Sequence, residues 1–381
     1  MKKMLVIGDG NSIFVKDFIA QYAKNGTVVD LITTSSENVQ GVRHQKKVTM
    51  GSSSIRVLRF FHYIFDFSKK LNDLSDEYDV VVIHFISPFL ALHINQIRKL
   101  SNNLVGVVWG SDFYRVNSNL KILFQNYIYK NLDRIVFTSD ETKNNFLEKK
   151  PFIDKRKMQV ARFGLPVLQE IDLLITANRD KKYQWYMNFG LYPNKTNVLV
   201  GYNADLAHQQ LQVIKLIAKL SNDTIEKIHL VFPLGYGSKE TKNKLENLLS
   251  EYKNISYVIL DKFYDFEEVA KLRILTDILI NVQPSDQFSG SMQETLYGGG
   301  YILTGNWLPY QTLKKYKPKM EFVDSVNDVG NRLQLMLHNN SKSSLENTAN
   351  IKKYISSTSS WDANIALWNK ILFPKGSGDG C

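Results

Sequence analysis

The chain has 381 residues, of which 44% are hydrophobic and 12% aromatic, a composition that is typical of globular proteins and excludes intrinsic disorder. This length is sufficient for two domains with full cores, and no apolar run reaches the roughly 18 residues that a membrane span needs. The single cysteine, Cys381, excludes an internal disulfide and a cysteine metal site. We therefore expect a cytoplasmic protein, and we set residues 376–381 aside as an added tail.

Positive charge is concentrated in the first half of the chain. The formal net charge is +11, and residues 1–190 hold 27 Lys and Arg against 18 Asp and Glu. A basic half can face nucleic acid, anionic lipid or a phosphate-bearing substrate. Because these cations are not interleaved with a nucleic-acid reading motif, we expect no nucleic-acid partner.

The chain opens with a strand, a turn and a helix. Residues 4–7 form an apolar run, a turn with Gly8 and Gly10 follows, and residues 13–24 have helical spacing before a second strand at 27–33. This order indicates a parallel Rossmann-type sheet. The turn lacks the third glycine of a dinucleotide fingerprint, so we expect no dinucleotide binding here.

Residues 52–74 have the pattern of a basic amphipathic helix. Arg and Lys flank one apolar row, which is formed by Ile55, Leu58, Phe61, Ile64 and Phe65. Most such helices pack on a sheet, but a basic, aromatic-rich helix also suits a membrane surface. Both interpretations remain open at this point.

Two further strands of the first half end in polar residues. The run at 78–85 ends around His84, and the run at 104–109 leads into Asp112. Open α/β sheets bind ligands at the carboxyl ends of their strands, so His84 and Asp112 are the acid/base candidates of this half. Alternatively, each is an ordinary loop residue with its hydrogen bonds satisfied.

The strand–helix pattern ends near residue 166 and restarts near 196. We expect an N-terminal domain at 1–166, an interdomain connection at 167–195, a second domain at 196–354, and a crossover helix at 355–375. Strands of the second domain are expected at residues 197–201, 227–232, 255–260, 277–282 and 301–304. The duplicated series predicts an α/β fold of two Rossmann-like, doubly wound domains.

The stretch 283–305 carries the clearest site signal. A polar loop and a small-residue turn follow a buried strand, and a short helix then stops at glycines 298–300. Unpaired N–H groups at such a helix start attract anions. Asp286 and Glu294 bracket the turn with seven residues between them, which suits a nucleotide-sugar; alternatively, Ser291 and Glu294 form only a capping box.

Three turns of the second domain are expected to meet at one sheet edge. His208 can donate to a diphosphate oxygen or be a buried structural residue, and the other two turns offer backbone amides. The predicted donor-binding residues are Asn203, His208, Tyr236, Gly237, Ser238, Ser289, Gly290, Ser291 and Glu294.

The stretch around Asp286 and Glu294 resembles the Glu-x7-Glu signature of GT-B glycosyltransferases, especially the GT4-like bacterial group. The resemblance places Glu294 on the ribose hydroxyls and Asp286, one methylene shorter than the usual glutamate, against the donor sugar. Residues 109–112 resemble a segment that follows a cleft-lining strand in that group. The expected Arg and Lys are missing from residues 201–210, where Asn203 and His208 stand, as in distant Fuc4NAc-transferase-like relatives.

This resemblance implies two domains facing a cleft, with a C-terminal helix crossing back to the first domain. It implies transfer from a UDP- or GDP-linked sugar to a glycan or polyprenyl-diphosphate-linked acceptor in bacterial surface-polysaccharide synthesis, with retention and without a metal or cofactor. Peripheral contact with anionic membrane at the inner face of the plasma membrane would fit the basic half. The alternatives are a non-catalytic GT-B-like partner protein and a sugar-nucleotide 2-epimerase.

Overall fold

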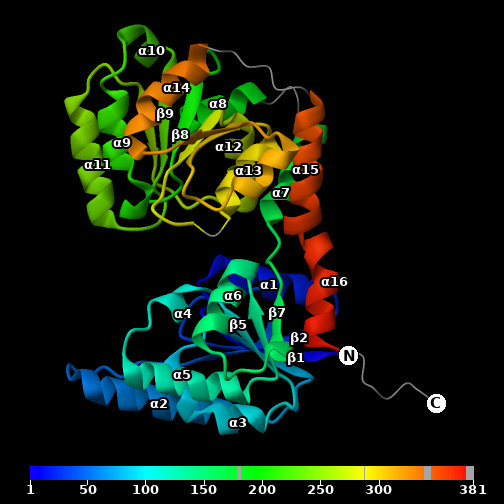
Figure 1. Ribbon diagram of the computed structural model, residues 1–381. Coiled ribbons are helices and arrows are strands. Elements are labelled where there is room, and N and C mark those ends of the chain that lie inside the picture. Colours follow the sequence, from blue (N-terminus) through cyan, green and yellow to red (C-terminus); the bar gives the residue numbers. More distant parts are fainter. Residues whose placement is uncertain (178–181, 287, 339–344, 375–381) are drawn as a thin grey trace. The chain divides into compact units, whose positions relative to one another are not determined.

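The computed structural model describes residues 1–177, 182–286, 288–338 and 345–374, and it divides into two compact units (Figure 1). The first unit comprises Met1–Gly164 and the chain from Trp361 onward, and the second comprises Leu165–Ser360. Residues 376–381 lie outside the described residues. Within the described part of the chain, no helix combines the length and the hydropathy of a membrane span.

The first unit is built on a seven-stranded parallel sheet of order β3-β2-β1-β4-β5-β6-β7. Its central strands are buried along nearly their whole length, as parallel strands covered on both faces are. The strands are β1 (Lys3–Ile7), β2 (Val28–Thr33), β3 (Val42–Lys47), β4 (Val80–His84), β5 (Leu104–Val108), β6 (Arg134–Phe137) and β7 (Met158–Val160).

Helices cover both faces of this sheet, as in a doubly wound fold (Figure 1). The core on one face includes side chains of α2 (Arg56–Asn72), η1 (Pro88–Leu92), α3 (Ile94–Arg98), α4 (Ser111–Tyr114), α5 (Asn119–Asn131) and α6 (Asp140–Lys149). The core on the other face includes side chains of α1 (Ile13–Lys24) and α16 (Trp361–Leu372).

The C-terminal helix α16 is part of the first unit, as the crossover prediction required. Trp368 is fully buried, and its Nε1 donates to the Arg162 carbonyl at 2.8 Å. Trp361 donates to the carboxylate of Asp17, whose pKa burial raises to about 6. Two tryptophans therefore fix this helix on α1 and the end of the first sheet.

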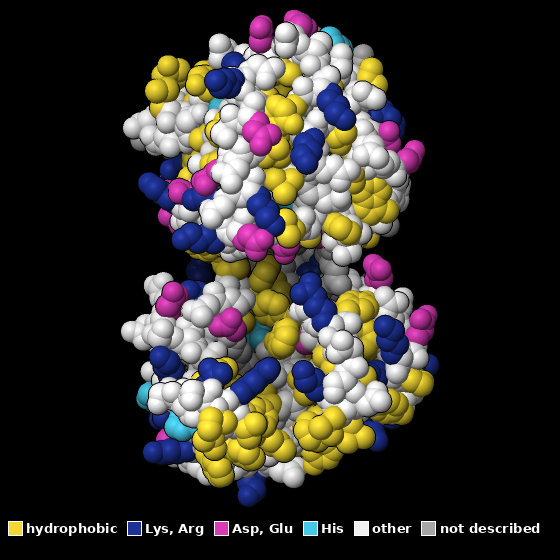
Figure 2. Space-filling model, turned by 90° about the vertical axis from the view of Figure 1, so that its left-hand side faces the viewer, with side chains coloured by type: hydrophobic (Ala, Val, Ile, Leu, Met, Phe, Trp, Pro, Cys, Tyr) yellow, Lys and Arg dark blue, Asp and Glu magenta, His cyan; other side chains and the backbone are white. Residues whose placement is uncertain are grey.

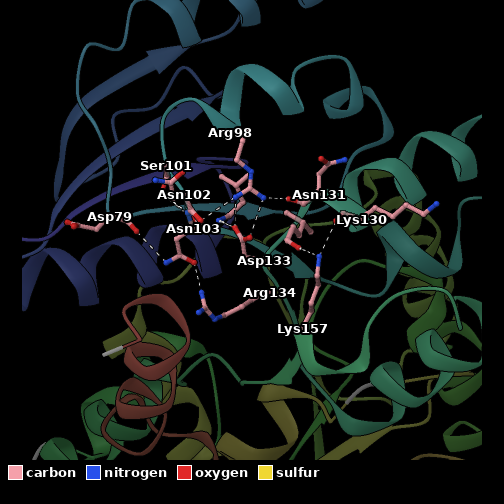
Figure 3. Close-up of polar contacts among 12 residues, drawn as sticks. Asp79, Arg98, Ser101, Asn102, Asn103, Lys130, Asn131, Asp133, Arg134 and Lys157 are labelled. Carbon is pink, nitrogen blue, oxygen red and sulfur yellow. Dashed lines mark hydrogen bonds and ion pairs between the residues drawn. The ribbon is translucent and has the colours of Figure 1, made fainter. Parts of the chain in front are cut away.

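Polar side chains fix the amino ends of β5 and β6 (Figure 3). Asp133 accepts from the Leu104 amide at 2.7 Å and from Arg98 Nη1 at 2.6 Å. Asn103 donates to the Leu372 carbonyl of α16 at 2.7 Å and accepts from Arg134. This network fixes the end of the sheet at which β5 and β6 begin, opposite their carboxyl ends.

The second unit repeats the strand order of the first in a six-stranded parallel sheet, β10-β9-β8-β11-β12-β13. Counted within each unit, six strands follow the same order, 3-2-1-4-5-6, which is the Rossmann order. The strands are β8 (Thr196–Val200), β9 (Ile228–Pro233), β10 (Tyr257–Leu260), β11 (Ile278–Asn281), β12 (Tyr301–Gly305) and β13 (Met320–Val323).

The second unit includes two helices from the segment 167–195, which the sequence pattern predicted to be an interdomain connection. α7 (Pro166–Ala177) and α8 (Lys182–Phe189) contribute Ile171, Trp185 and Phe189 to its core. Their apolar side chains pack against the unit, so the segment 167–195 is part of that domain. The other helices are α9 (Gln210–Ile217), α10 (Asn222–Glu226), α11 (Lys239–Glu251), α12 (Phe266–Leu275), α13 (Gly290–Gly298), α14 (Val329–His338) and α15 (Leu345–Ser359).

The crossover helix begins later than residue 355. α15 belongs to the second unit, where Ile351 and Ile355 are buried in the same core as α13. The division falls between Ser360 and Trp361, because Trp361 and Trp368 pack in the core of the first unit.

Replacing Trp368 tests how much the first unit depends on α16. We expect Trp368→Ala to lower the free energy of unfolding of that unit by about 3–5 kcal/mol, because it opens a large cavity. Leu367→Ala, at a position 39% exposed on the same helix, should change it by less than about 0.5 kcal/mol. Urea unfolding followed by circular dichroism measures both variants; equal losses would contradict the assignment of Trp368 to the core.

Candidate functional site

The candidate site lies at the carboxyl ends of β8 and β11. These two strands are parallel neighbours, with Val198 opposite Ile278 and Val200 opposite Ile280. The chain continues from β8 toward β9 and from β11 toward β12, which lie on opposite sides of the pair. Such a switch point leaves room between the diverging turns, and ligands of open α/β sheets bind there.

The turns after β8 and β9 are joined by backbone hydrogen bonds. The Ala204 amide donates to the Tyr236 carbonyl at 2.9 Å, and the Ser238 amide donates to the Ala204 carbonyl at 3.0 Å. Gly237 has a φ of 111°, and a Cβ there would lie 2.8 Å from the Ala204 backbone. A glycine is therefore required where these two predicted donor-binding turns touch.

His208 is buried beside the same turn. Its ring meets that of Tyr202 edge-on at a centroid distance of 4.2 Å, and its Nδ1 has no hydrogen-bond partner among the described residues. Burial lowers the pKa of His208 to about 4, so the imidazole is neutral at pH 7. It can donate one hydrogen bond but contributes no positive charge.

Asp286 sits among neutral donors. Its Oδ2 accepts from Asn281 Nδ2 at 3.1 Å and from Gln283 Nε2 at 3.4 Å, and Tyr310 also donates to it. Gln283 Nε2 also lies 3.0 Å from the Tyr202 hydroxyl, so the loop after β11 is connected to the turn after β8. Burial, followed by the nearby Asp286 charge, raises the pKa of the Tyr310 hydroxyl well above its usual range.

Glu294 is held by a cation. Arg273 Nε on α12 donates to Glu294 Oε2 at 3.0 Å, and Arg273 Nη2 donates to Ser291 Oγ at 2.5 Å. Both side chains of this ion pair are about nine-tenths buried. Arg273 Nη1 is also buried and has no partner among the described residues. The guanidinium thus fixes the direction of the carboxylate.

The start of α13 is capped by Ser289. Its Oγ accepts from the Met292 amide at 3.4 Å, so Ser291 and Glu294 do not form a capping box. The first N–H groups of the helix, around Gly290 and Ser291, have no partner within the helix. The helix ends as the glycines predicted, with Gly299 at a φ of 97°.

In the first unit, His84 is enclosed by aromatic rings. It stacks on Phe163 at a centroid distance of 5.8 Å and meets Phe18 and Trp109 edge-on. Neither ring nitrogen has a hydrogen-bond partner in the part of the chain that is described. Burial lowers the pKa of His84 to about 3, so the side chain is a neutral core residue at pH 7.

Asp112 is also buried and binds backbone amides. Its two oxygens accept from the Ile86 amide at 2.8 Å and from the Trp109 amide at 2.9 Å. Burial raises its pKa to about 6, although these hydrogen bonds favour the ionised form. Asp112 therefore connects the carboxyl ends of β4 and β5, an arrangement that favours a positioning role over proton exchange with a substrate.

Sequence reasoning missed Arg273 and Tyr310, which hold the two predicted carboxylates. Neither residue belongs to a local motif, because Arg273 lies 21 positions from Glu294 and Tyr310 lies 24 from Asp286. No set of three or more His, Cys, Asp or Glu side chains in the described ranges is placed to bind a metal ion.

Comparisons with known proteins agree with this architecture. Residues 8–165 match the sequence model of Glycosyltransferase Family 4. No curated protein is significantly similar in sequence to the chain. Among solved structures, sucrose-phosphate synthase from Thermosynechococcus elongatus is 14% identical with a TM-score of 0.71, and the match covers 97% of this chain and 98% of that one.

Two further structures show the same fold. WaaG, a glycosyltransferase involved in lipopolysaccharide biosynthesis, is 14% identical with a TM-score of 0.70, covering 98% of this chain and 100% of that chain. Anabaena Alr3699/HepE in complex with UDP is 11% identical with a TM-score of 0.68, covering 97% and 99%. The chain has the GT-B fold, as predicted.

The neutral His84 predicts a specific loss of stability in acid. Its folded pKa is lowered, so the unfolded chain takes up a proton that the folded chain does not, as pH falls from about 6.5 toward about 3. We expect about 2 kcal/mol of this loss at about pH 5. His84→Leu should cost less than about 1.5 kcal/mol at neutral pH and should remove this loss, as measured by urea unfolding at both pH values. An unchanged pH dependence in the variant would contradict a buried neutral His84.

The Arg273–Glu294 pair predicts strong coupling between the two positions. Glu294→Ala leaves a buried guanidinium without its counter-charge and should cost about 3–5 kcal/mol of unfolding free energy. The double variant Arg273→Met/Glu294→Ala should lose clearly less than the sum of the two single variants. A double-mutant cycle by urea unfolding measures this; additive losses would show that the two side chains are independent.

Proposed function

We propose that this protein is a glycosyltransferase that moves a sugar from a UDP- or GDP-linked donor to a glycan or polyprenyl-diphosphate-linked acceptor in bacterial surface-polysaccharide synthesis. One observation carries the proposal: hydrogen bonds link the turns at 202–208 and 236–238 with Gln283 and Asp286 of the loop after β11, and Arg273 fixes the carboxylate that follows on α13. The match of residues 8–165 to a glycosyltransferase family supports it.

In this proposal Glu294 accepts hydrogen bonds from the ribose hydroxyls of the donor. Arg273 already holds one carboxylate oxygen, so little ordering is required when the nucleoside binds. Gly290 lies close to this carboxylate, because a Cβ there would lie 3.7 Å from Glu294 Oε1 and 3.1 Å from Leu165 Cδ2. The structures of Alr3699/HepE with UDP and with UDP-glucose support this class of ligand.

The predicted Ser238 and Ser289 amides already donate to the Ala204 carbonyl and the Tyr310 hydroxyl. The donor diphosphate is therefore proposed to meet the remaining backbone N–H groups of the two turns, those of Tyr236, Gly237, Gly290 and Ser291. These groups and the dipole of α13 are fixed before the reaction, so they can stabilise the negative charge that develops on the leaving diphosphate. Asn203 and neutral His208 add side-chain donors at the same edge. In this mechanism oriented dipoles alone stabilise the negative charge, and neither a metal nor a cofactor takes part.

Asp286 is proposed to face the donor sugar, with its direction set by Asn281, Gln283 and Tyr310. A carboxylate at this place fits a retaining transfer. In the first unit, His84 and Asp112 are proposed to shape the acceptor side, His84 by packing and Asp112 by connecting two strand ends. The basic first unit is proposed to contact anionic membrane peripherally, at the inner face of the plasma membrane.

A nucleotide screen tests the donor site. We expect UDP or GDP to raise the thermal unfolding temperature of the protein, whereas CMP should have little effect. A ligand at 100 times its Kd stabilises the folded state by about 2.7 kcal/mol. Glu294→Gln keeps a side chain of the same size and should abolish most of this shift.

The matched control is Glu251→Gln, the same change at an exposed position at the end of α11. It should leave both the unfolding temperature and the nucleotide shift unchanged. The nucleotide shift of each variant is measured relative to the unfolding temperature of the same variant without nucleotide, so a lower stability of Glu294→Gln does not affect the comparison. A full shift in Glu294→Gln would remove Glu294 from the donor site, and the absence of a shift with every nucleotide would contradict the proposed donor.

A further inference from the structure

The first two turns of α2 carry large apolar side chains that the fold does not cover. Residues 55–62 are all exposed, and Phe61 and Phe65 are 51% and 72% exposed. Only the second half of the helix packs on the sheet, through Phe67 and Leu71. A contiguous group of exposed Ile, Val, Leu and Phe side chains marks a surface that another molecule covers.

This apolar surface continues onto η1 and α5. On α2, Tyr63 and Phe67 contact Phe89 of η1 at ring-centroid distances of 4.9 and 5.6 Å, and η1 also packs against α5. A groove of about 550 Å³ lies between η1 and α5, and its lining includes Leu92, Leu123, Tyr127, Lys130 and Phe152. We define the docking face as the exposed residues 55–62 and 65, at the start of α2, together with this groove.

The docking face is surrounded by cations. Residues 46–65 contain Lys46, Lys47, Arg56 and Arg59 but no Asp or Glu, and residues 113–132 contain three cations and again no acid. Arg43 on β3 does not add to this charge, because it is paired with Asp30 and Asp76. Figure 2 shows hydrophobic side chains gathered on the first unit with Lys and Arg side chains among them. The covering surface must therefore be both apolar and negatively charged.

We infer that the docking face binds the surface of an anionic lipid bilayer. A second copy of the chain fits less well, because symmetric pairing would bring Arg56 and Arg59 of both copies together. In a bilayer the apolar side chains of α2 enter the boundary between headgroups and acyl chains, and the cations remain beside lipid phosphates. The groove beside Lys130 has the polarity for a hydrocarbon chain with a phosphate at its end.

This inference deepens the proposed function, because it names the surface through which the first unit makes its membrane contact. It rests on that function for the reason why a lipid surface is near the enzyme. Docking would bring the first unit to the membrane where a polyprenyl-linked acceptor resides. Vesicle binding needs neither donor nor acceptor, so it succeeds or fails independently of the nucleotide screen.

Flotation of the full-length protein with vesicles tests the inference. We expect binding to vesicles of phosphatidylcholine mixed with phosphatidylglycerol, little binding to phosphatidylcholine alone, and loss of binding in high salt. Phe60→Ser/Phe61→Ser should weaken binding by at least about tenfold. Arg56→Gln/Arg59→Gln should weaken it by about 30-fold and reduce its salt dependence, since each cation near the surface contributes roughly fivefold.

The control variant is Leu335→Ser on α14 of the second unit, where the leucine is 51% exposed, like Phe61. It should bind vesicles as the wild type does, and all variants should keep the wild-type unfolding temperature and nucleotide shift. Equal vesicle binding by Phe60→Ser/Phe61→Ser and the wild type would overturn the inference. So would a wild-type dimer in sedimentation that this double substitution converts to monomer without any vesicle binding.

Discussion

The parallel pairing of β8 with β11 is the constraint on which the candidate site depends. Because the two strands end at the same level, the turn after β8 and the loop after β11 begin side by side. The hydrogen bond between Gln283 and Tyr202 then connects them, and the backbone bonds at Ala204 add the turn after β9. Side chains 81 positions apart, those of Tyr202 and Gln283, are thereby brought into contact.

The two carboxylates of this edge are held by different chemistry. Asp286 accepts from neutral side chains, which orient it without neutralising its charge. Glu294 pairs with the Arg273 guanidinium, and such charge-assisted bonds are shorter and stronger than neutral ones. A buried pair also costs desolvation, so its value lies in fixing a direction more than in stabilising the fold. The site thus combines one carboxylate held by neutral donors with one paired to a cation.

Most of the fold could be predicted because buried parallel strands have short, continuous apolar sequences. β3 was not predicted, since an edge strand with the sequence Val-Arg-His-Gln-Lys-Lys has no such run. The segment 167–195 was predicted as a connection because its packing partners, α12 and α13, lie a hundred residues further along the chain. A sequence pattern does not show which distant element covers an apolar helix.

The candidate site could be predicted only where its parts are local. The seven-residue spacing of Asp286 and Glu294 and the glycine end of α13 are sequence features, and the structure places Asp286 in the loop before that helix and Glu294 within it. The environments of His84 and Asp112 could not be predicted, because burial depends on rings and amides contributed by α1 and by the segments that follow β4, β5 and β7. For the same reason, the sequence does not distinguish a strand-end histidine that faces solvent from one that faces the core.

The return of α16 to the first unit has a consequence during translation. A ribosome adds roughly 5–20 residues per second, so the roughly 200 residues between Gly164 and Trp361 take about 10–40 s to emerge. Through this interval the nascent first unit lacks the tryptophans that cover Phe18 and Phe163. The first unit is therefore the first to be synthesised and the last to be completed. During this interval chaperones can bind its uncovered aromatic side chains.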